Sequence, residues 1–466
     1  MNPPRPSPTN LKPAIEKLLP RITTLRPFQW QCALDLWQHR SRTFLMKACG
    51  SGKTFIWITL SILYFFVQQA FKGTSHTVLI VSAPLNQIII EQIKLVQEMK
   101  GWRAYNFADN PEECEQALTT DILKNPTIIF WNPHEATEGN LLKAIKASKH
   151  NRIGGIAYDE AGTVVDWGTG EAFRPVLSRQ INLVKTCEEH YHKKMPFIVF
   201  TGVASLRTRE TIDQIFLGGV DQLEWDRSII TSPFGTDGSH IALKVIVVRT
   251  REQETSAIKK GVANAYKTHP APGKITVLVP YVKNLKTLQK IIIEAINTDV
   301  NLPITEGVSS VFAGDECVNK KRDLDLFTRG GDEDGVRAHR SVHHRVLLST
   351  FAMMATGSNI YGIAESFCKG QPSNVELMVQ AWYRVMRRKL LYGTIFVIAS
   401  WWRRLELKFL AYQALVAKES SEATRRHACN QLAEIDELSY LLLFPDEKCI
   451  LRAIDTLIMV SSKWYW

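Results

Sequence analysis

Residues that could bind a nucleoside triphosphate stand near the start of the chain, in the run Ala48-Cys49-Gly50-Ser51-Gly52-Lys53-Thr54. Glycines let backbone N–H groups converge on phosphate oxygens without a Cβ in the way. Lys53 would neutralise the β- and γ-phosphates, and the Thr54 hydroxyl would ligate magnesium. The strict P-loop pattern is not fully met, because Lys47 stands where its first glycine belongs. The run nevertheless predicts a phosphate-binding loop made by Gly50, Ser51, Gly52, Lys53 and Thr54.

A pair of carboxylates, Asp159 and Glu160, follows the apolar run Ile156-Ala157-Tyr158. Ligands of open α/β sheets bind at the carboxyl ends of strands, where this pair would lie. One carboxylate would hold magnesium, usually through water, and the other would orient and deprotonate the attacking water. An isolated pair is more often a solvated acidic loop, but the preceding P-loop favours a site. We therefore expect ATP and Mg²⁺ as cofactors and ATP hydrolysis as the reaction.

Strand-like and helical patterns alternate along the chain, which predicts an α/β fold of parallel sheets covered by helices. The expected strands are 43–46, 78–82, 127–131, 153–158 and 197–201, and then 241–248, 274–280, 345–350 and 393–400. A Gly- and Pro-containing stretch separates the two series. We expect a flexible leader over 1–19, one lobe over 20–232, a second over 233–400 and a small helical segment over 401–466.

The composition indicates an intracellular protein with a polyanionic partner. The net charge is +11 and the isoelectric point is near 9.2, which favours a polyanionic partner, although proteins without such a partner also carry diffuse positive charge. Eight cysteines without a CxxC pair argue for reduced thiols. The start of the chain is rich in proline and does not read as a signal peptide, and the most apolar run, 55–67, is too short to cross a bilayer. No membrane association is expected.

Two further segments could complete a nucleotide site. Gln29 follows Leu25-Arg26-Pro27-Phe28, and its amide could read the adenine edge because it donates and accepts at once. Gln29 could equally cap a helix or face solvent. Arg26, in the same segment, is also expected to bind the nucleotide. Arg384 and Arg387 share one helical face after Gln380, and could reach a γ-phosphate from the second lobe. A basic helix that binds DNA or lies in solvent is the alternative.

The order of these motifs resembles that of superfamily 2 helicases. It runs Gln29, the P-loop, Asp159-Glu160-Ala161, Thr201-Gly202-Val203-Ala204-Ser205, Ser349-Thr350 and Gln380 to Arg387. Residues 159–175 resemble the RecQ DNA helicases, whose Asp-Glu-Ala-His box runs into an aromatic-rich loop, Trp-Gly-His-Asp-Phe-Arg-Pro. Residues 200–210 are similar to the RecQ segment Leu-Thr-Ala-Thr-Ala-Thr-Pro-Arg-Val-Arg-Glu, and 81–85 to its Val-Ser-Pro-Leu. The resemblance covers roughly residues 20–460.

The resemblance implies two RecA-like lobes, the first binding ATP, in a 3′→5′ DNA helicase or translocase. It implies single-stranded and forked DNA as partners, and roles in recombination and repair in a nucleus or nucleoid. Trp167, Phe173 and Arg174 would form the loop that senses DNA, with aromatic faces stacking on bases; ordinary core packing is the alternative for the two aromatic residues. Thr350 would also contact DNA. The implied catalytic residues are Lys53, Asp159, Glu160, Gln380, Arg384 and Arg387.

Several residues depart from the family pattern. Gly162 replaces the box histidine, and Tyr383 replaces a glycine of the last motif. Residues 401–466 resemble a remnant of the RecQ zinc subdomain, in which Cys449 matches one ligand but Leu442 stands at another. Because tetrahedral zinc needs four ligands, we expect no zinc. The chain also stops before the winged-helix domain that many family members carry. A catalytically impaired relict that binds DNA is thus an alternative, and an RNA-directed ATPase is a third.

Overall fold

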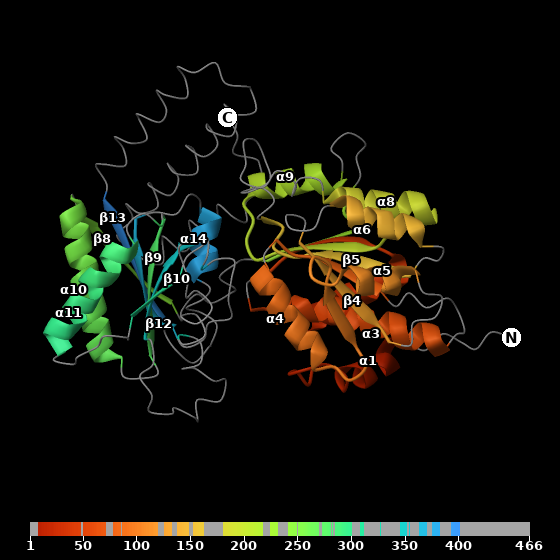
Figure 1. Ribbon diagram of the computed structural model, residues 1–466, viewed down its shortest axis with the longest axis horizontal. Coiled ribbons are helices and arrows are strands. Elements are labelled where there is room, and N and C mark those ends of the chain that lie inside the picture. Colours follow the sequence, from red (N-terminus) through yellow and green to blue (C-terminus); the bar gives the residue numbers. More distant parts are fainter. Residues whose placement is uncertain are drawn as a thin grey trace, which may run out of the picture. The chain divides into compact units, whose positions relative to one another are not determined.

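The computed structural model describes residues 8–47, 50–70, 78–84, 86–119, 125–132, 138–148, 152–162, 180–217, 224–231, 241–248, 250–269, 273–280, 282, 285–300, 308–311, 327, 345–351, 354, 363–370, 375–382 and 393–400. The chain divides into two compact units, the first ending at Thr231 and the second beginning at Ser232. Both are α/β, as Figure 1 shows.

The first unit is built on a parallel sheet that has seven strands in the described part of the chain, in the order β3-β4-β2-β5-β6-β1-β7. The strands are β1 (Arg42–Met46), β2 (Val78–Ser82), β3 (Arg103–Asn106), β4 (Thr127–Trp131), β5 (Ile153–Tyr158), β6 (Phe197–Thr201) and β7 (Arg227–Ile230). Every neighbouring pair is parallel. The sequence-based prediction of a parallel α/β fold is confirmed.

The inner strands form where the sequence carries uninterrupted apolar runs. Every residue of β2, β4, β5 and β6 is buried, as is usual for parallel strands covered by helices on both faces. The edge strands β3 and β7 are partly exposed and carry fewer apolar residues. Neither was among the strands expected from the sequence.

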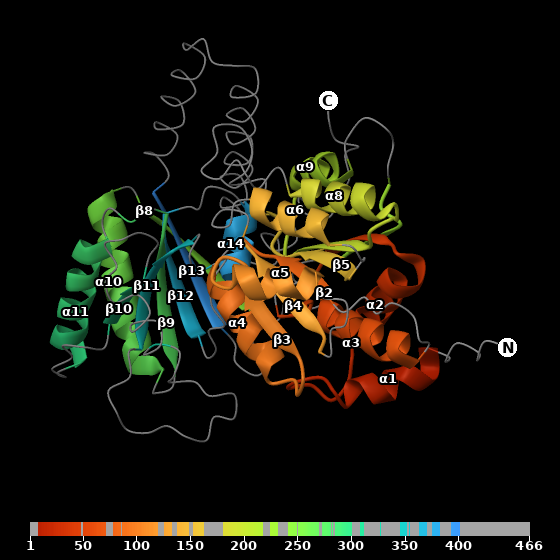
Figure 2. The same ribbon diagram turned by 45° about the vertical axis from the view of Figure 1, so that its right-hand side comes forward.

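Helices cover both faces of this sheet. They are α1 (Pro8–Glu16), α2 (Pro27–His39), α3 (Thr54–Ala70), α4 (Asn86–Gln97), α5 (Pro111–Thr119), α6 (Glu138–Ala147), α8 (Ile181–Tyr191) and α9 (Leu206–Leu217). Figure 2 shows α1, α2 and α3 on one side of the sheet and α6 and α8 on the other. Helix α1 lies within the segment expected to be a flexible leader; the structure differs because Ile15 and Leu19 are buried in the core.

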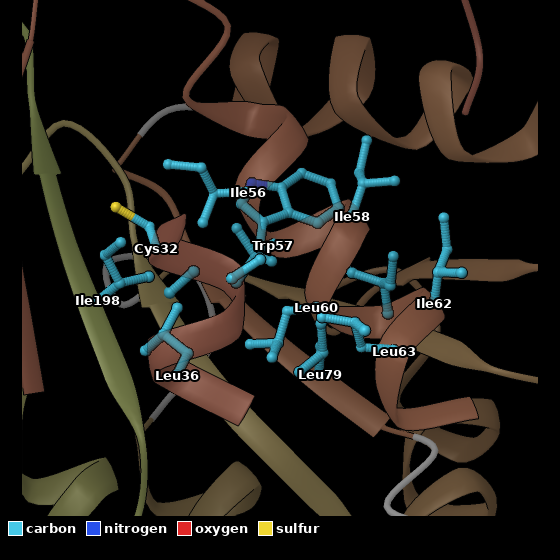
Figure 3. Close-up of a cluster of buried hydrophobic side chains, with 14 of the residues drawn as sticks. Cys32, Leu36, Ile56, Trp57, Ile58, Leu60, Ile62, Leu63, Leu79 and Ile198 are labelled. Carbon is cyan, nitrogen blue, oxygen red and sulfur yellow. The ribbon is translucent and has the colours of Figure 1, made fainter. Parts of the chain in front are cut away.

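The main core lies between α2, α3 and the sheet. In Figure 3, Leu36 of α2 and Leu60 of α3 lie in one cluster with Leu79 of β2 and Ile198 of β6. Each fully buried aliphatic side chain of this kind stabilises the fold by about 1.5–3 kcal/mol. On the opposite face, the ring of Tyr158 packs 4.7 Å from that of Phe216 on α9, measured between centroids. Both faces of the sheet are therefore covered by packed side chains.

The second unit contains another parallel sheet, with six strands in its described part, in the order β10-β11-β9-β12-β13-β8. These are β8 (Ile241–Val248), β9 (Lys274–Val279), β10 (Val308–Val311), β11 (Val346–Thr350), β12 (Ile363–Lys369) and β13 (Gly393–Ser400). Its helices are α10 (Arg251–Thr268), α11 (Leu285–Val300) and α14 (Val375–Trp382). Figure 1 shows α10 and α11 together on one side of this sheet and α14 on the other.

The core of the second unit lies where α10 and α11 meet the sheet, around Ile258, Ile292 and Val277. Among the helices that the structure describes, none combines the length and the apolar character needed to cross a membrane. The expected helical segment 401–466 lies outside the described residues.

Candidate nucleotide-binding site

The phosphate-binding motif begins at the carboxyl end of β1, a strand inside the first sheet. β1 lies between β6 and β7, with Met46 opposite both Thr201 and Ile230. The N–H of Lys47 donates to the Thr201 carbonyl oxygen over 3.1 Å. On the other side, the N–H and the hydroxyl of Thr231 each donate to the Met46 carbonyl oxygen over 3.1 Å. The strand that leads into the motif is therefore held from both sides.

Two glycines of the motif adopt backbone conformations that other residues rarely tolerate. Gly50 has φ +75° and Gly52 has φ +81°, both in the left-handed region. A Cβ at Gly52 would lie 2.5 Å from Nε2 of Gln29, whereas one at Gly50 would meet nothing within 4 Å. A Cβ at position 52 would therefore force the amide of Gln29 to shift, in addition to straining the backbone. Helix α3 starts directly afterwards, at Thr54.

Lys53 is held against the backbone of the loop. Its Nζ atom donates to the Lys47 carbonyl oxygen over 2.8 Å, and the residue is only 9% exposed. Lys47 itself places its Nζ atom 4.6 Å from the centroid of the Phe28 ring. Partial burial lowers the pKa of Lys47, and the positive charges of Arg26 and Lys53 lower it further. These cations converge on the part of the chain where an anionic phosphate group is expected.

Gln29 links α2 to the loop. It is the third residue of α2, and its Oε1 atom accepts from the Arg26 N–H over 2.7 Å, which caps the helix. Its Nε2 atom donates to the Gly52 carbonyl oxygen over 2.7 Å, and Nη1 of Arg26 donates to the Ser51 carbonyl oxygen over 3.0 Å. The amide expected to read adenine is therefore bonded to backbone at both ends. Its role toward the base remains a prediction.

Asp159 stands at the carboxyl end of β5, separated from β1 only by β6 in the sheet. Because the strands are parallel, both carboxyl ends meet at one edge of the sheet. The Asp159 N–H donates to the Ser82 carbonyl oxygen over 2.8 Å. Its Oδ2 atom accepts from Nε2 of Gln92 on α4 over 2.7 Å. The carboxylate is therefore oriented by a helix of the same unit.

The charge state of Asp159 depends on its neighbours. Burial raises the pKa of the Asp159 carboxyl group, and the positive charge of Lys53 and the hydrogen bond from Gln92 oppose that rise. Lys53 thus interacts electrostatically with Asp159. The cation of the first motif and the carboxylate of the second thus lie close enough for their charges to interact. Their joint role in binding magnesium and a nucleotide stays a prediction.

Glu160 has an unusual backbone conformation. Its φ is +51°, in the left-handed region that costs a residue with a Cβ about 1–2 kcal/mol. Two hydrogen bonds hold the turn: the Glu160 N–H donates to Oδ1 of Asp159 over 3.0 Å, and the Ala161 N–H donates to the Phe200 carbonyl oxygen over 2.8 Å. Gly162, which stands where the RecQ box has a histidine, follows Ala161 and is also buried. Local strain of this kind is common at functional sites.

The described residues fit a magnesium-bound triphosphate. The Ser51 Oγ atom is buried and has no hydrogen-bond partner among the residues that the structure describes, so it can accept a bond from or donate one to a ligand. The N-terminus of α3 adds the positive end of a helix dipole. Thr54 and Asp159 would hold magnesium, and the metal would supply charge neutralisation at the phosphates.

The other predicted site residues fall in two groups. Thr350 ends β11 and Gln380 lies in α14, and both are buried in the second unit. The remaining residues, Trp167, Phe173, Arg174, Arg384 and Arg387, lie outside the described residues, as do Tyr383 and Cys449. Their roles stay predictions.

Gln92 was not among the predicted site residues, although the sequence carries a signal for it. Ile89 and Val96, three residues before and four after, are fully buried, so Gln92 stands on the apolar face of α4. A polar residue in such a position usually has a specific partner. Here that partner is Asp159.

No protein-family model matches the sequence, and no curated protein matches it either. The structure is similar to the DUF1998 helicase MrfA bound to DNA and AMPPNP, with a TM-score of 0.57 and 15% identity over 85% of this chain and 51% of that one. The chain therefore spans about half the length of MrfA.

The match with two further helicases covers a larger share of their length. The DEAD-box helicase Mss116 bound to ssRNA and UDP-BeF matches with a TM-score of 0.59 and 14% identity, over 96% of this chain and 88% of that one. S. cerevisiae Dbp5 bound to RNA and ADP BeF3 matches with a TM-score of 0.54 and 12% identity, over 92% and 94%. At these identities the likeness concerns the fold alone.

Proposed function

We propose that this chain is an ATP-dependent nucleic-acid helicase or translocase, and specifically a RecQ-type enzyme that moves 3′→5′ on DNA. The observation that supports it best is the electrostatic interaction between Lys53 and Asp159, which follow the carboxyl ends of two parallel strands of one sheet. Beside Lys53 lies a glycine loop with two positive φ values. Solved helicases of the same fold are bound to nucleic acid and to nucleotide analogues.

In this proposal each residue of the site has a separate task. Residues 50–54 bind the phosphates, with Lys53 supplying positive charge, and Asp159 holds the hydrated magnesium. Glu160 orients and deprotonates the attacking water. Gln380, Arg384 and Arg387 keep the catalytic roles that the resemblance to helicases implies for them. Arg26 and Gln29 position the loop and the nucleotide.

DNA is the nucleic acid favoured by the sequence. Trp167, Phe173 and Arg174, together with Thr350, would contact a single strand or a fork, and the net charge of +11 would favour binding to a polyanion. Recombination and repair in a nucleus or nucleoid would then be the cellular setting. MrfA, a neighbour in fold, is bound to DNA, whereas Mss116 and Dbp5 are bound to RNA. RNA is therefore the competing substrate that the test must include.

The test is steady-state ATP hydrolysis with no nucleic acid, with single-stranded DNA and with single-stranded RNA. We expect DNA to stimulate the wild-type chain, and Lys53→Ala and Glu160→Gln to abolish the stimulation. Glu115→Gln, at an exposed position on α5, is the control for removing a carboxylate and should keep it. Stimulation by RNA alone would contradict the DNA assignment. Unwinding of 3′-tailed but not 5′-tailed duplexes would support the 3′→5′ polarity.

A second candidate is a relict that binds DNA without productive turnover. It is favoured by Gly162 in the place of the box histidine and by Gln29, whose amide is bonded to backbone at both ends. Binding of fluorescent single-stranded DNA separates the candidates. DNA binding without any Glu160-dependent hydrolysis would support the relict and overturn the motor.

A further inference from the structure

Gln92 has one polar atom bonded to the candidate site and one without a partner. Nε2 donates to Oδ2 of Asp159 over 2.7 Å, and the residue is only 7% exposed. Oε1 is buried and finds no hydrogen-bond partner among the residues that the structure describes. Since buried polar atoms are almost always hydrogen-bonded in proteins, this atom calls for a donor.

The donor must come from a group that belongs beside Asp159. The two oxygens of that carboxylate already accept from Gln92 and from the Glu160 N–H, so its orientation is fixed from two directions. A carboxylate of this kind would bind magnesium through water, because Mg²⁺ gives up its water ligands reluctantly. Metal-bound water is a strong donor. The amide oxygen of Gln92 is an acceptor on the same side chain whose Nε2 atom donates to Asp159.

We propose that Gln92 is a positioning residue of the magnesium site, which orients Asp159 through Nε2 and accepts a hydrogen bond from magnesium-bound water through Oε1. The proposal rests on the proposed ATP-binding function and deepens it, because it adds a residue of α4 to the shell around the metal. Groups that orient the ligands of a metal commonly change its affinity by about 10–100-fold when they are removed.

The experiment measures metal binding without turnover. Free Mn²⁺ is followed by electron paramagnetic resonance while it is titrated into protein saturated with AMPPNP. We expect Gln92→Met, which keeps the length of the side chain but loses both polar atoms, to weaken Mn²⁺ binding by about 10–100-fold. Gln97→Met, at an exposed position on the same helix, is the matched control and should bind Mn²⁺ as the wild type does.

A second variant separates a role at the metal from a role in packing. Gln92→Glu loses the donor but keeps an acceptor and adds negative charge, so its Mn²⁺ affinity should exceed that of Gln92→Met. Equal weakening in both variants would overturn the water contact, and wild-type affinity in both would overturn the whole proposal. Thermal unfolding checks that each variant folds. If Gln92→Met does not fold, Gln92→Glu decides, because an Mn²⁺ affinity equal to that of the wild type would overturn the proposal.

The wild-type titration distinguishes this proposal from the one on which it rests. If the wild-type chain binds neither AMPPNP nor Mn²⁺ with it, the nucleotide function fails. If the wild type binds both and Gln92→Met does so equally well, only the role of Gln92 fails.

Discussion

The Nε2 atom of Gln29 lies 2.7 Å from the carbonyl oxygen of Gly52, so the first turn of α2 is bonded to the glycine loop that is proposed to bind phosphate. The other end of the same amide caps α2 through the Arg26 N–H. One side chain thus fixes the start of a helix and the shape of a loop more than twenty residues away in the chain. The first prediction follows from the space that this contact occupies.

Gly52→Ala should destabilise the first unit and abolish nucleotide binding. The new Cβ would be 2.5 Å from Gln29 Nε2, and alanine would also be strained at φ +81°. We expect the free energy of unfolding to fall by about 1–3 kcal/mol, measured by urea denaturation, with AMPPNP binding followed by calorimetry. Gly50→Ala, with φ +75° and open space, carries the backbone strain alone and is the control.

The double variant Gln29→Ala/Gly52→Ala tests the cause of that loss. Removing the glutamine side chain clears the contact, so part of the lost stability should return. If Gly50→Ala and Gly52→Ala are equally unstable and the double variant recovers nothing, the contact with Gln29 has no energetic role.

Acid should selectively weaken the edge of the first sheet at Asp226. Oδ2 of Asp226 accepts from the Arg42 N–H over 2.6 Å and from Nζ of Lys194 over 2.7 Å. Partial burial acts to raise the pKa of Asp226, but these hydrogen bonds and the two positive charges outweigh it and lower the pKa. Stability from a lowered pKa is complete above the unfolded value of about 3.9 and disappears as the pH falls through the folded value.

Asp226→Asn should therefore lower the melting temperature near neutral pH, with a difference from wild type that vanishes in acid. Because this carboxylate is exposed, we expect less than about 1 kcal/mol. Differential scanning fluorimetry across the pH range measures the effect. Glu224→Gln removes the same charge two residues away and is the control. A deficit that persisted below both pKa values would show that the carboxylate charge is not the cause.

Removing one partner of the ion pair between Asp35 and Arg227 should lower the free energy of unfolding more than removing both. It joins α2 to β7, and Gln31 also donates to Asp35 over 2.9 Å. The Asp35 side chain is only 12% exposed. Arg227→Leu leaves a largely buried carboxylate without its cation, and we expect a loss of about 1–3 kcal/mol.

Asp35→Leu/Arg227→Leu removes both charges and should be more stable than Arg227→Leu alone. A double-mutant cycle in guanidinium chloride gives the coupling energy between the two residues. A coupling energy of zero would show that the pair contributes nothing to the attachment of β7.

Gly261→Ala should destabilise the second unit, although alanine favours helix by about 1 kcal/mol over glycine. A Cβ at this position of α10 would lie 2.4 Å from the ring of Phe367, which is 2% exposed. Overpacking of this kind typically costs about 1–3 kcal/mol. Ser256→Ala, at an exposed position of α10, is the control and should not destabilise.

Gly261→Ala/Phe367→Leu should recover stability, because the smaller side chain leaves room for the new methyl group. Thermal unfolding followed by circular dichroism compares the variants. If Gly261→Ala is as stable as the wild type, the ring of Phe367 can move aside at no cost and the overpacking argument is wrong.

In the first unit the sequence predicted the inner strands because each is an apolar run that the fold buries on both faces. In the second unit it missed β12, an inner strand whose apolar residues are interrupted by Glu365 and Ser366. The run Arg103-Ala104-Tyr105-Asn106 gives no such signal, since β3 lies at the edge of the sheet and is only partly buried. Lys53 and Asp159 could be assigned from their motifs. The left-handed conformation of Glu160 could not, because glutamate carries no preference for it and only the surrounding hydrogen bonds hold it there.

The attachment of Thr231 to Met46 has a mechanical consequence. The first unit ends at Thr231, whose N–H and hydroxyl both donate to the carbonyl oxygen of the last residue of β1. Tension carried along the backbone from the second unit is therefore delivered to the residue that precedes Lys47. The glycines proposed to bind phosphate follow within a few residues, so pulling on this connection and binding a nucleotide at the proposed site would act on the same strand end.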